Sequence, residues 1–109
     1  MKWLLEPDHN AQRVVHKVEI TNGTEPNGTG FTEVEMPVHS KILWAEYQMT
    51  PGVWGVWYET DLDLIEDRVT VRFEWFSTGK LITGPQAEYV CTQRAYSGKF
   101  MIHLYWWVL

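Results

Sequence analysis

Cysteine is nearly absent from this chain, which has one, Cys91, among 109 residues. A lone cysteine cannot form a disulfide within the chain, so a small secreted scaffold held together by disulfides is excluded. Long apolar runs are also scarce. The first residues, MKWLLEPDHN, reach Glu6 before an apolar stretch of signal-peptide length has formed. The apolar end of the chain supplies roughly half of the ~20 residues that a membrane-spanning helix needs. We therefore expect a cytoplasmic protein without membrane contact.

Basic residues are outnumbered, with 9 Lys and Arg against 14 Asp and Glu and a formal net charge of −5. Proteins that bind nucleic acids neutralise backbone phosphates with a basic surface. No nucleic-acid partner is therefore expected. The negative charge is modest, and solubility accounts for it.

Motifs for metal binding and catalysis are missing too. The four histidines, at positions 9, 16, 39 and 103, have no local metal-ligand spacing, although His16 and His103 on distant strands leave an assembled site open. The acidic run at 59–67 lacks the central glycine of a calcium loop. The serines have no nucleophile elbow around them, and STGK at 77–80 precedes a β segment rather than a helix. We expect no enzymatic activity, no cofactor and no metal ion.

Alternation of apolar and polar residues with period two recurs along the chain. It is clearest at 68–76, where Val69, Val71, Phe73 and Trp75 share one face. Segments rich in Gly, Pro and Asn, such as the twice-repeated Asn-Gly-Thr of 21–30, separate these stretches and favour turns. The predicted strands are 14–20, 31–36, 41–49, 53–60, 68–76, 87–94 and 99–109.

The connections between these strands are too short for crossover helices, so the pairing should be antiparallel, with hairpins at 41–60 and 87–109. The expected fold is all-β, a small antiparallel sandwich or partly open barrel of six to seven strands. We expect one domain over 1–109, made of an arm or short helix at 1–12 and a β domain at 13–109. Alternation also places Cys91 on the face of Tyr89, and we expect a buried, inert thiol.

Aromatic residues are the surplus of this composition, at 15% of the chain with seven Trp. On the strand at 53–60 and on the closing strand, both faces carry Trp or Tyr. A sandwich strand normally buries one face, so some of these rings should cover an interface or lie beneath another segment. The candidate partner-binding residues are Trp54, Trp57, Tyr58, Tyr105 and Trp107.

The alternative that the sequence leaves open is a protein that binds a small molecule or sequesters a nucleotide. Bases stack on aromatic rings, and arginine pairs with phosphate. The arginines that would supply these contacts are Arg68, Arg72 and Arg94.

Short motifs along the chain match, in order and spacing, the pattern of a known family. They are Glu35-Met36-Pro37, Lys41-Ile42-Leu43, Gln48, Gly52, Val53-Trp54, Asp61, Arg72-Phe73, Thr78-Gly79, Glu88-Tyr89-Val90 and Ile102-His103. Over roughly residues 12–107 the chain thus resembles a family of small, uncharacterised domains encoded mainly by bacteriophages. The resemblance implies a phage origin and a compact β domain, and it implies no activity. Trp57, Tyr58, Trp106 and Trp107 are additions to the family pattern.

These observations together favour a small phage protein that acts by protein–protein interaction in the host cytoplasm. Its partner would be a host protein, a phage protein or a second copy of the chain, bound through an aromatic sheet face formed by 53–58 and 101–107. Pairing of two chains through an open sheet edge is a natural form of self-association.

Overall fold

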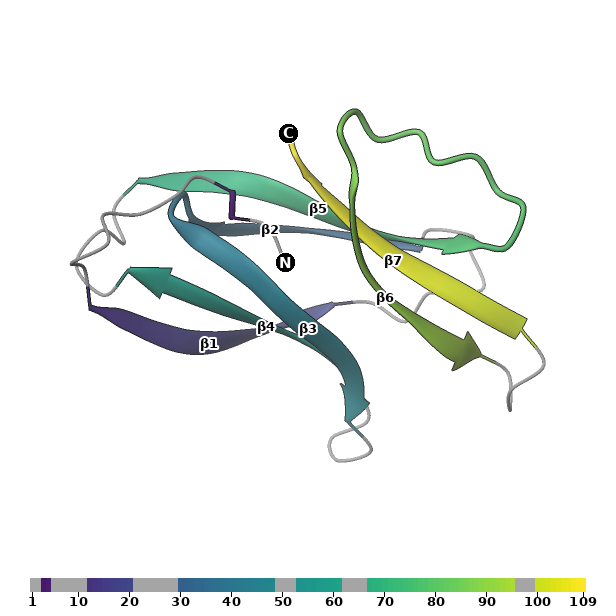
Figure 1. Cartoon of the computed structure of the whole chain (residues 1–109), viewed down its shortest axis with the longest axis horizontal. Coiled ribbons are helices and arrows are strands. Elements are labelled where there is room, and N and C mark those ends of the chain that lie inside the picture. The colour runs from purple at the N-terminus through teal and green to yellow at the C-terminus, as the bar shows by residue number, and fades with distance from the viewer. Residues whose placement is uncertain (1–2, 5–11, 21–29, 49–52, 62–66, 96–99) are drawn as a thin grey trace.

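Seven strands make up most of the part of the chain that the structure, a computed structural model, describes (Figure 1). The described residues are 3–4, 12–20, 30–48, 53–61, 67–95 and 100–109. The strands are β1 Arg13–Ile20, β2 Phe31–Pro37, β3 Ser40–Gln48, β4 Val53–Asp61, β5 Arg68–Ser77, β6 Glu88–Ala95 and β7 Phe100–Val108. Each predicted strand is confirmed, with its ends displaced by at most one residue.

The strands form two antiparallel sheets that pack face to face as a small, open β-sandwich. The three-stranded sheet has the order β1-β4-β3, and the four-stranded sheet has the order β2-β5-β7-β6. Both predicted hairpins are confirmed, because β3 pairs with β4 and β6 pairs with β7. The all-β prediction is confirmed as well, and the two sheets form a small sandwich, not a closed barrel.

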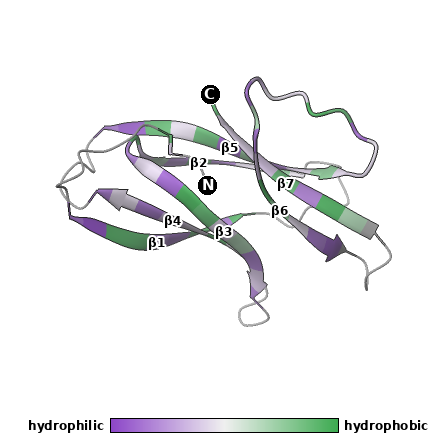
Figure 2. Cartoon of the chain, viewed as in Figure 1, coloured by the Kyte–Doolittle hydropathy of each residue, from purple (hydrophilic) through white to green (hydrophobic). Residues whose placement is uncertain are grey.

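Alternation along the strands explains the core, since each strand turns every second side chain inward and hydropathy changes from residue to residue (Figure 2). The two sheets meet where Trp54 of β4 lies against Trp75 of β5, with ring centroids 4.6 Å apart. The fully buried side chains around them include Met36, Val56, Val71 and Leu104. Tilted ring pairs of this kind add stability beyond their buried area.

Buried polar groups join the two sheets at the link between β2 and β3. Ser40 donates a hydrogen bond to the carbonyl of Pro37 at 2.6 Å, and Thr60 of β4 donates to the carbonyl of His39 at 3.0 Å. Val38 donates its backbone N–H to the carbonyl of Asp67. The connection from β2 to β3 passes from one sheet to the other, and its polar groups find hydrogen-bond partners within the chain.

A β-bulge at Val90 changes the predicted placement of Cys91. Tyr89 pairs with Tyr105, but Cys91 pairs with Leu104, so one extra residue lies in β6. Cys91 therefore points into the core and is buried, whereas Tyr89 is 53% exposed on the outer face. The prediction that these two side chains share a face was wrong, because strict alternation cannot anticipate a bulge.

The segment 78–87 connects β5 to β6 as a long loop (Figure 1) and packs on the outer face of the four-stranded sheet. It starts with a tight turn in which the Lys80 N–H bonds the Ser77 carbonyl and Gly79 adopts a positive φ of 92°. At Gly84 the backbone approaches Trp107 so closely that a Cβ atom would overlap the indole ring. Trp107 is consequently only 5% exposed.

Trp3 and Leu4 belong to the predicted N-terminal arm, which otherwise lies outside the described residues apart from Gln12. Trp3 forms an isolated antiparallel bridge with Lys41, and the Leu4 N–H bonds the carbonyl of Ser40 at 2.8 Å. The predicted turns at 21–29 and 50–52, and most of the acidic run at 59–67, also lie outside the described residues. Among the described residues no helix is long and apolar enough to cross a membrane.

The contact between Gly84 and Trp107 predicts a specific loss of stability. Gly84→Ala should lower the free energy of unfolding by about 1–3 kcal/mol, because the added methyl overlaps a buried ring. Urea unfolding followed by tryptophan fluorescence measures the change. In a Trp107→Leu background, Gly84→Ala should lower the free energy of unfolding by less, because the overlapping ring is gone. An equal loss of unfolding free energy in the two backgrounds would contradict this packing.

Cys91 provides a second prediction. Burial raises the pKa of its thiol, and a hydrogen bond with the Gln93 side chain lowers that pKa by a smaller amount. A raised pKa reduces the thiolate fraction near neutral pH, and thiolate is the reactive form. The folded protein should therefore react much more slowly with iodoacetamide at a pH of about 7.5 than the protein unfolded in guanidinium. Similar rates in the two states would contradict a buried thiol.

Candidate interaction surface

Three apolar side chains from three neighbouring strands lie on the outer surface of the three-stranded sheet. They are Val15 of β1, Trp57 of β4 and Trp44 of β3, and we call this surface the tryptophan face. Trp44 and Trp57 are direct cross-strand partners, and Val15 lies diagonally across from Trp57. Val15 is 54% exposed, Trp44 is 46% exposed, and Trp57 is half-buried. Exposed apolar groups gathered on one face of a small domain are a feature of interaction surfaces, so this face is the candidate.

Gly55 sets the position of the Trp57 ring on this face. A Cβ at residue 55 would meet atoms of the Trp57 ring at 3.1 and 3.3 Å, and the Lys17 side chain at 3.1 Å. The indole therefore lies across the backbone of β4 in space that the glycine leaves open. The same gap lets Lys17 of β1 reach over β4 and donate a hydrogen bond to the Gln48 amide oxygen on β3, at 2.7 Å. The Trp57 ring stays partly exposed in this position.

Charged and polar side chains surround this apolar centre. Arg13 forms an ion pair with Glu59 at 3.5 Å, and Glu19 and Glu46 are exposed on the neighbouring strands. Groups of both signs therefore stand around the rim. An apolar aromatic centre with a polar rim is the usual anatomy of a protein–protein interface.

Of the five predicted partner-binding residues, one, Trp57, lies on the tryptophan face. Trp54 is 5% exposed and packs on Trp75 in the core, so it has no surface to offer a partner. Tyr58 faces inward, is half-buried against the core, and contacts the ring of His16 at 5.9 Å between centroids. Sequence reasoning missed Trp44 and Val15.

Tyr105 and Trp107 lie on a different surface, the outer face of the four-stranded sheet. Trp107 is covered there by the loop at Gly84. Tyr105 is half-buried between Phe76 and Tyr89, with ring centroids 5.8 and 5.6 Å away. The predicted surface formed jointly by 53–58 and 101–107 is therefore divided between opposite sides of the sandwich.

The outer face of the four-stranded sheet also carries a network of ion pairs centred on Arg72. Its guanidinium pairs with Glu33, lies 3.8 Å from Glu74, and stands over the Phe31 ring at 4.2 Å from the centroid. Glu74 is nearly buried and lies 3.7 Å from the ammonium group of Lys80. Arg72 therefore already has partners within its own chain.

The three arginines named as possible phosphate ligands do not converge. Arg68 donates a hydrogen bond to the backbone carbonyl of Glu35 at 2.9 Å. Arg72 lies opposite Trp107 and Arg94 lies opposite Met101, so six residues of β7 separate their positions. Six residues of strand span about 20 Å. The strand register thus separates the groups that a nucleotide phosphate would need together.

The two histidines left open for an assembled metal site lie in different sheets. His16 belongs to β1, and its ring lies tilted against that of Tyr58. His103 hydrogen-bonds through both ring nitrogens, with Thr92 at 2.9 Å and with Thr78 at 3.0 Å. Within the ranges that the structure covers, no three His, Cys, Asp or Glu side chains are grouped to hold a metal ion.

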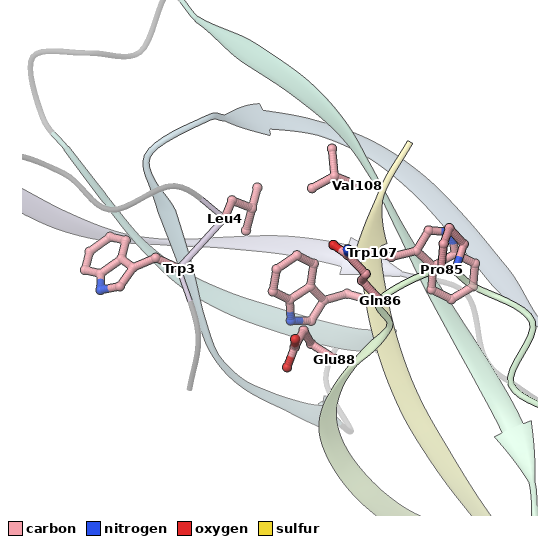
Figure 3. Close-up of a pocket in the computed structure, with 8 residues that line it drawn as sticks. Trp3, Leu4, Pro85, Gln86, Glu88, Trp107 and Val108 are labelled. Carbon is pink, nitrogen blue, oxygen red and sulfur yellow. The ribbon is translucent and has the colours of Figure 1, made fainter.

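A hollow of about 150 Å³ lies between the N-terminal residues Trp3 and Leu4 and the end of β7 (Figure 3). Trp107 and Pro85 stand at one end of it and Trp3 at the other, with the Glu88 side chain on its wall. Two cations already stand over the Trp3 ring. The guanidinium carbon of Arg13 on β1 lies 5.2 Å from the ring centroid, and the ammonium nitrogen of Lys41 on β3 lies 5.6 Å from it. The hollow is too small for a nucleotide, and its lining residues include no cation for phosphate.

Comparison with known proteins assigns a family to the whole β domain. The domain of unknown function DUF7352 matches residues 11–107, a range that reaches from β1 into the end of β7. No curated protein and no solved structure matches the chain. The match spans most of the 109 residues, and the chain therefore belongs to the DUF7352 family.

Proposed function

We propose that this chain is a small non-enzymatic protein that binds a partner protein through the tryptophan face. The observation that carries the proposal is the exposure of Val15, Trp44 and Trp57 on one face of neighbouring strands, with charged side chains around them. Trp residues near the centre of an interface contribute a large share of binding energy once a partner excludes water from them. The partner surface that would complement this face carries a small apolar projection with charges of both signs around it.

The setting that we propose is the host cytoplasm during phage infection, with a host or phage protein as partner. The sequence motifs from Glu35-Met36-Pro37 to Ile102-His103 support it, because they resemble domains that bacteriophages encode. The chemistry of the tryptophan face favours binding over catalysis. Its three central side chains carry no nucleophile, acid or base, and the charged groups Arg13 and Glu59 on its rim pair with each other.

Two substitutions on the tryptophan face test this proposal. Trp44→Thr and Trp57→Thr keep a residue that favours strands while removing the ring. Each should weaken partner binding at least about tenfold, equivalent to about 1.4 kcal/mol, because rings at an interface centre dominate affinity. The partner is identified by affinity purification from infected host cells, and calorimetry with the two purified proteins then measures the dissociation constant.

Tyr89→Thr is the matched control, because Tyr89 is 53% exposed but belongs to the opposite sheet. It should bind the partner like the unaltered chain. Circular dichroism and urea unfolding establish that all three variants are folded. Unchanged affinity in folded Trp44→Thr and Trp57→Thr variants would refute the proposal, and so would an equal loss in Tyr89→Thr.

Nucleotide binding has less support, since Arg68, Arg72 and Arg94 are separated and Arg72 is paired with Glu33. Nucleoside mono-, di- and triphosphates at millimolar concentration should therefore leave the thermal unfolding temperature unchanged. A ligand present far above its dissociation constant would raise that temperature by mass action. A reproducible rise that Arg94→Ala removes would favour nucleotide binding instead.

A further inference from the structure

An open sandwich leaves strand edges whose backbone groups can pair with another chain, and the described residues include four such edges. They are β1 and β3 in one sheet and β2 and β6 in the other. Bulges interrupt two of them, at Leu43 in β3 and at Val90 in β6. Trp3 additionally pairs with β3 at Lys41. Bulges and covering segments are devices by which proteins block edge pairing.

The two remaining edges, β1 and β2, differ in their charges. β2 ends in Pro37, and antiparallel pairing of two copies about its central residue, Val34, would place Glu33 opposite Glu35 in both halves. Like charges directly opposite one another destabilise a strand pair. β1 has eight residues in unbroken register with β4 and contains no proline.

Symmetric pairing of two antiparallel β1 strands is possible in few registers. In an antiparallel strand pair, directly opposite residues point to the same face of the sheet. Two copies of β1 related by a two-fold axis can therefore pair only odd-numbered residues with odd and even-numbered residues with even, which means that one residue lies on the axis opposite its own copy. Centring on Val15 would place Arg13 opposite Lys17, and centring on Lys17 would place that ammonium group opposite its own copy. Both of these registers bring like charges together.

Two registers bring opposite charges together, and they differ in length. Centring on Val18 places Lys17 opposite Glu19 but aligns only residues 16–20 of the strand with their copies. Centring on His16 places Arg13 opposite Glu19, twice, and aligns residues 13–19. The second register pairs more backbone and also brings Val15 into the strand pair. Charge and length together therefore select the register centred on His16.

We propose that two copies of this chain associate by antiparallel pairing of their β1 strands, with Arg13 of each copy opposite Glu19 of the other. In this register Val14 of one copy faces Val18 of its partner on the inner side of the sheet. On the outer side, Val15 lies opposite Lys17 of the second copy, whose side chain reaches across its own β4 to Gln48. Val15 is 54% exposed in the single chain, and the strand added beside it would cover part of that apolar surface.

The surroundings of Glu19 suit this role. Its partner position on β4 is Gly55, which has no side chain, so that position offers Glu19 no ion pair. Arg13 lies 3.5 Å from Glu59 within its own chain and would gain Glu19 of the second copy as a further carboxylate. Each dimer would thus contain two symmetric Arg–Glu contacts across the new strand pair.

The dimer would join two three-stranded sheets into one continuous sheet of six strands. Both tryptophan faces would then lie on the same side of that sheet. The inference rests on the edge of β1 and on none of the Trp44 or Trp57 contacts, and it shares one side chain, Val15, with the tryptophan face. It would nevertheless make the proposed binding bivalent, which increases avidity for a partner that presents two sites.

Charge reversal tests the register. Sedimentation velocity across a concentration series should show a reversible dimer for the unaltered chain. Arg13→Glu and Glu19→Arg should each weaken dimerisation at least about tenfold, because each converts two attractive contacts into two repulsive ones. An equimolar mixture of the two variants should dimerise again, since the carboxylate introduced at position 13 of one then faces the guanidinium introduced at position 19 of the other. Such rescue is specific to this register.

Glu46→Arg is the control, because it reverses an exposed charge on β3 of the same sheet and should dimerise like the unaltered chain. Circular dichroism establishes that each variant is folded. The inference is overturned if the unaltered chain stays monomeric at high micromolar concentration, or if the single variants dimerise normally. Failure of the mixture of folded variants to associate would also overturn it. Loss of dimer in Trp44→Thr or Trp57→Thr, with no effect of charge reversal, would assign self-association to the tryptophan face instead.

Discussion

The contact between Trp54 and Trp75 is the interaction on which the rest of this structure depends. It joins the two sheets at the centre of the sandwich, with ring centroids 4.6 Å apart. Because side chains alternate along a strand, fixing Trp54 and Trp75 inward also fixes the residues that point outward. On β4 this places Trp57 outside, and on β5 it places Arg72 and Phe76 outside. The two outer faces follow from this choice, one built around two Trp rings and the other around an ion-pair network.

The two outer faces illustrate different ways to treat an aromatic ring that the core does not use. On the four-stranded sheet, the loop 78–87 folds back and covers Trp107 at Gly84. On the three-stranded sheet, Trp44 and Trp57 remain partly open to solvent. A glycine takes part in both arrangements, since Gly84 lets a backbone approach a ring and Gly55 lets a ring lie across a backbone. Because Trp44 and Trp57 stay partly exposed whereas Trp107 is covered, Trp44 and Trp57 are the stronger candidates for binding a partner.

Bulges have a double effect in this molecule. The bulge at Leu43 turns Trp44 to the outer face while Ile42 and Ala45 stay in the core, and the bulge at Val90 turns Cys91 inward while Tyr89 stays outside. Both bulges also lie in edge strands, where they oppose pairing with other chains. β1 is an edge without such an interruption. The bulge at Leu43 thus helps to form the tryptophan face, and the uninterrupted edge of β1 is the one that the proposed dimer uses.

The amino-acid sequence by itself determined the all-β class, the seven strands and both hairpins, because period-two alternation and turn residues act locally. It also identified Trp57 as a ring on the face opposite Trp54. Tertiary structure decided what no local pattern carries: the bulge that exposes Trp44, the loop that buries Trp107, and the register that separates Arg72 from Arg94. Each of these depends on residues far apart in the chain. Alternation shows which side chains share a face, and only the packing of the two sheets and the loop decides which face is covered.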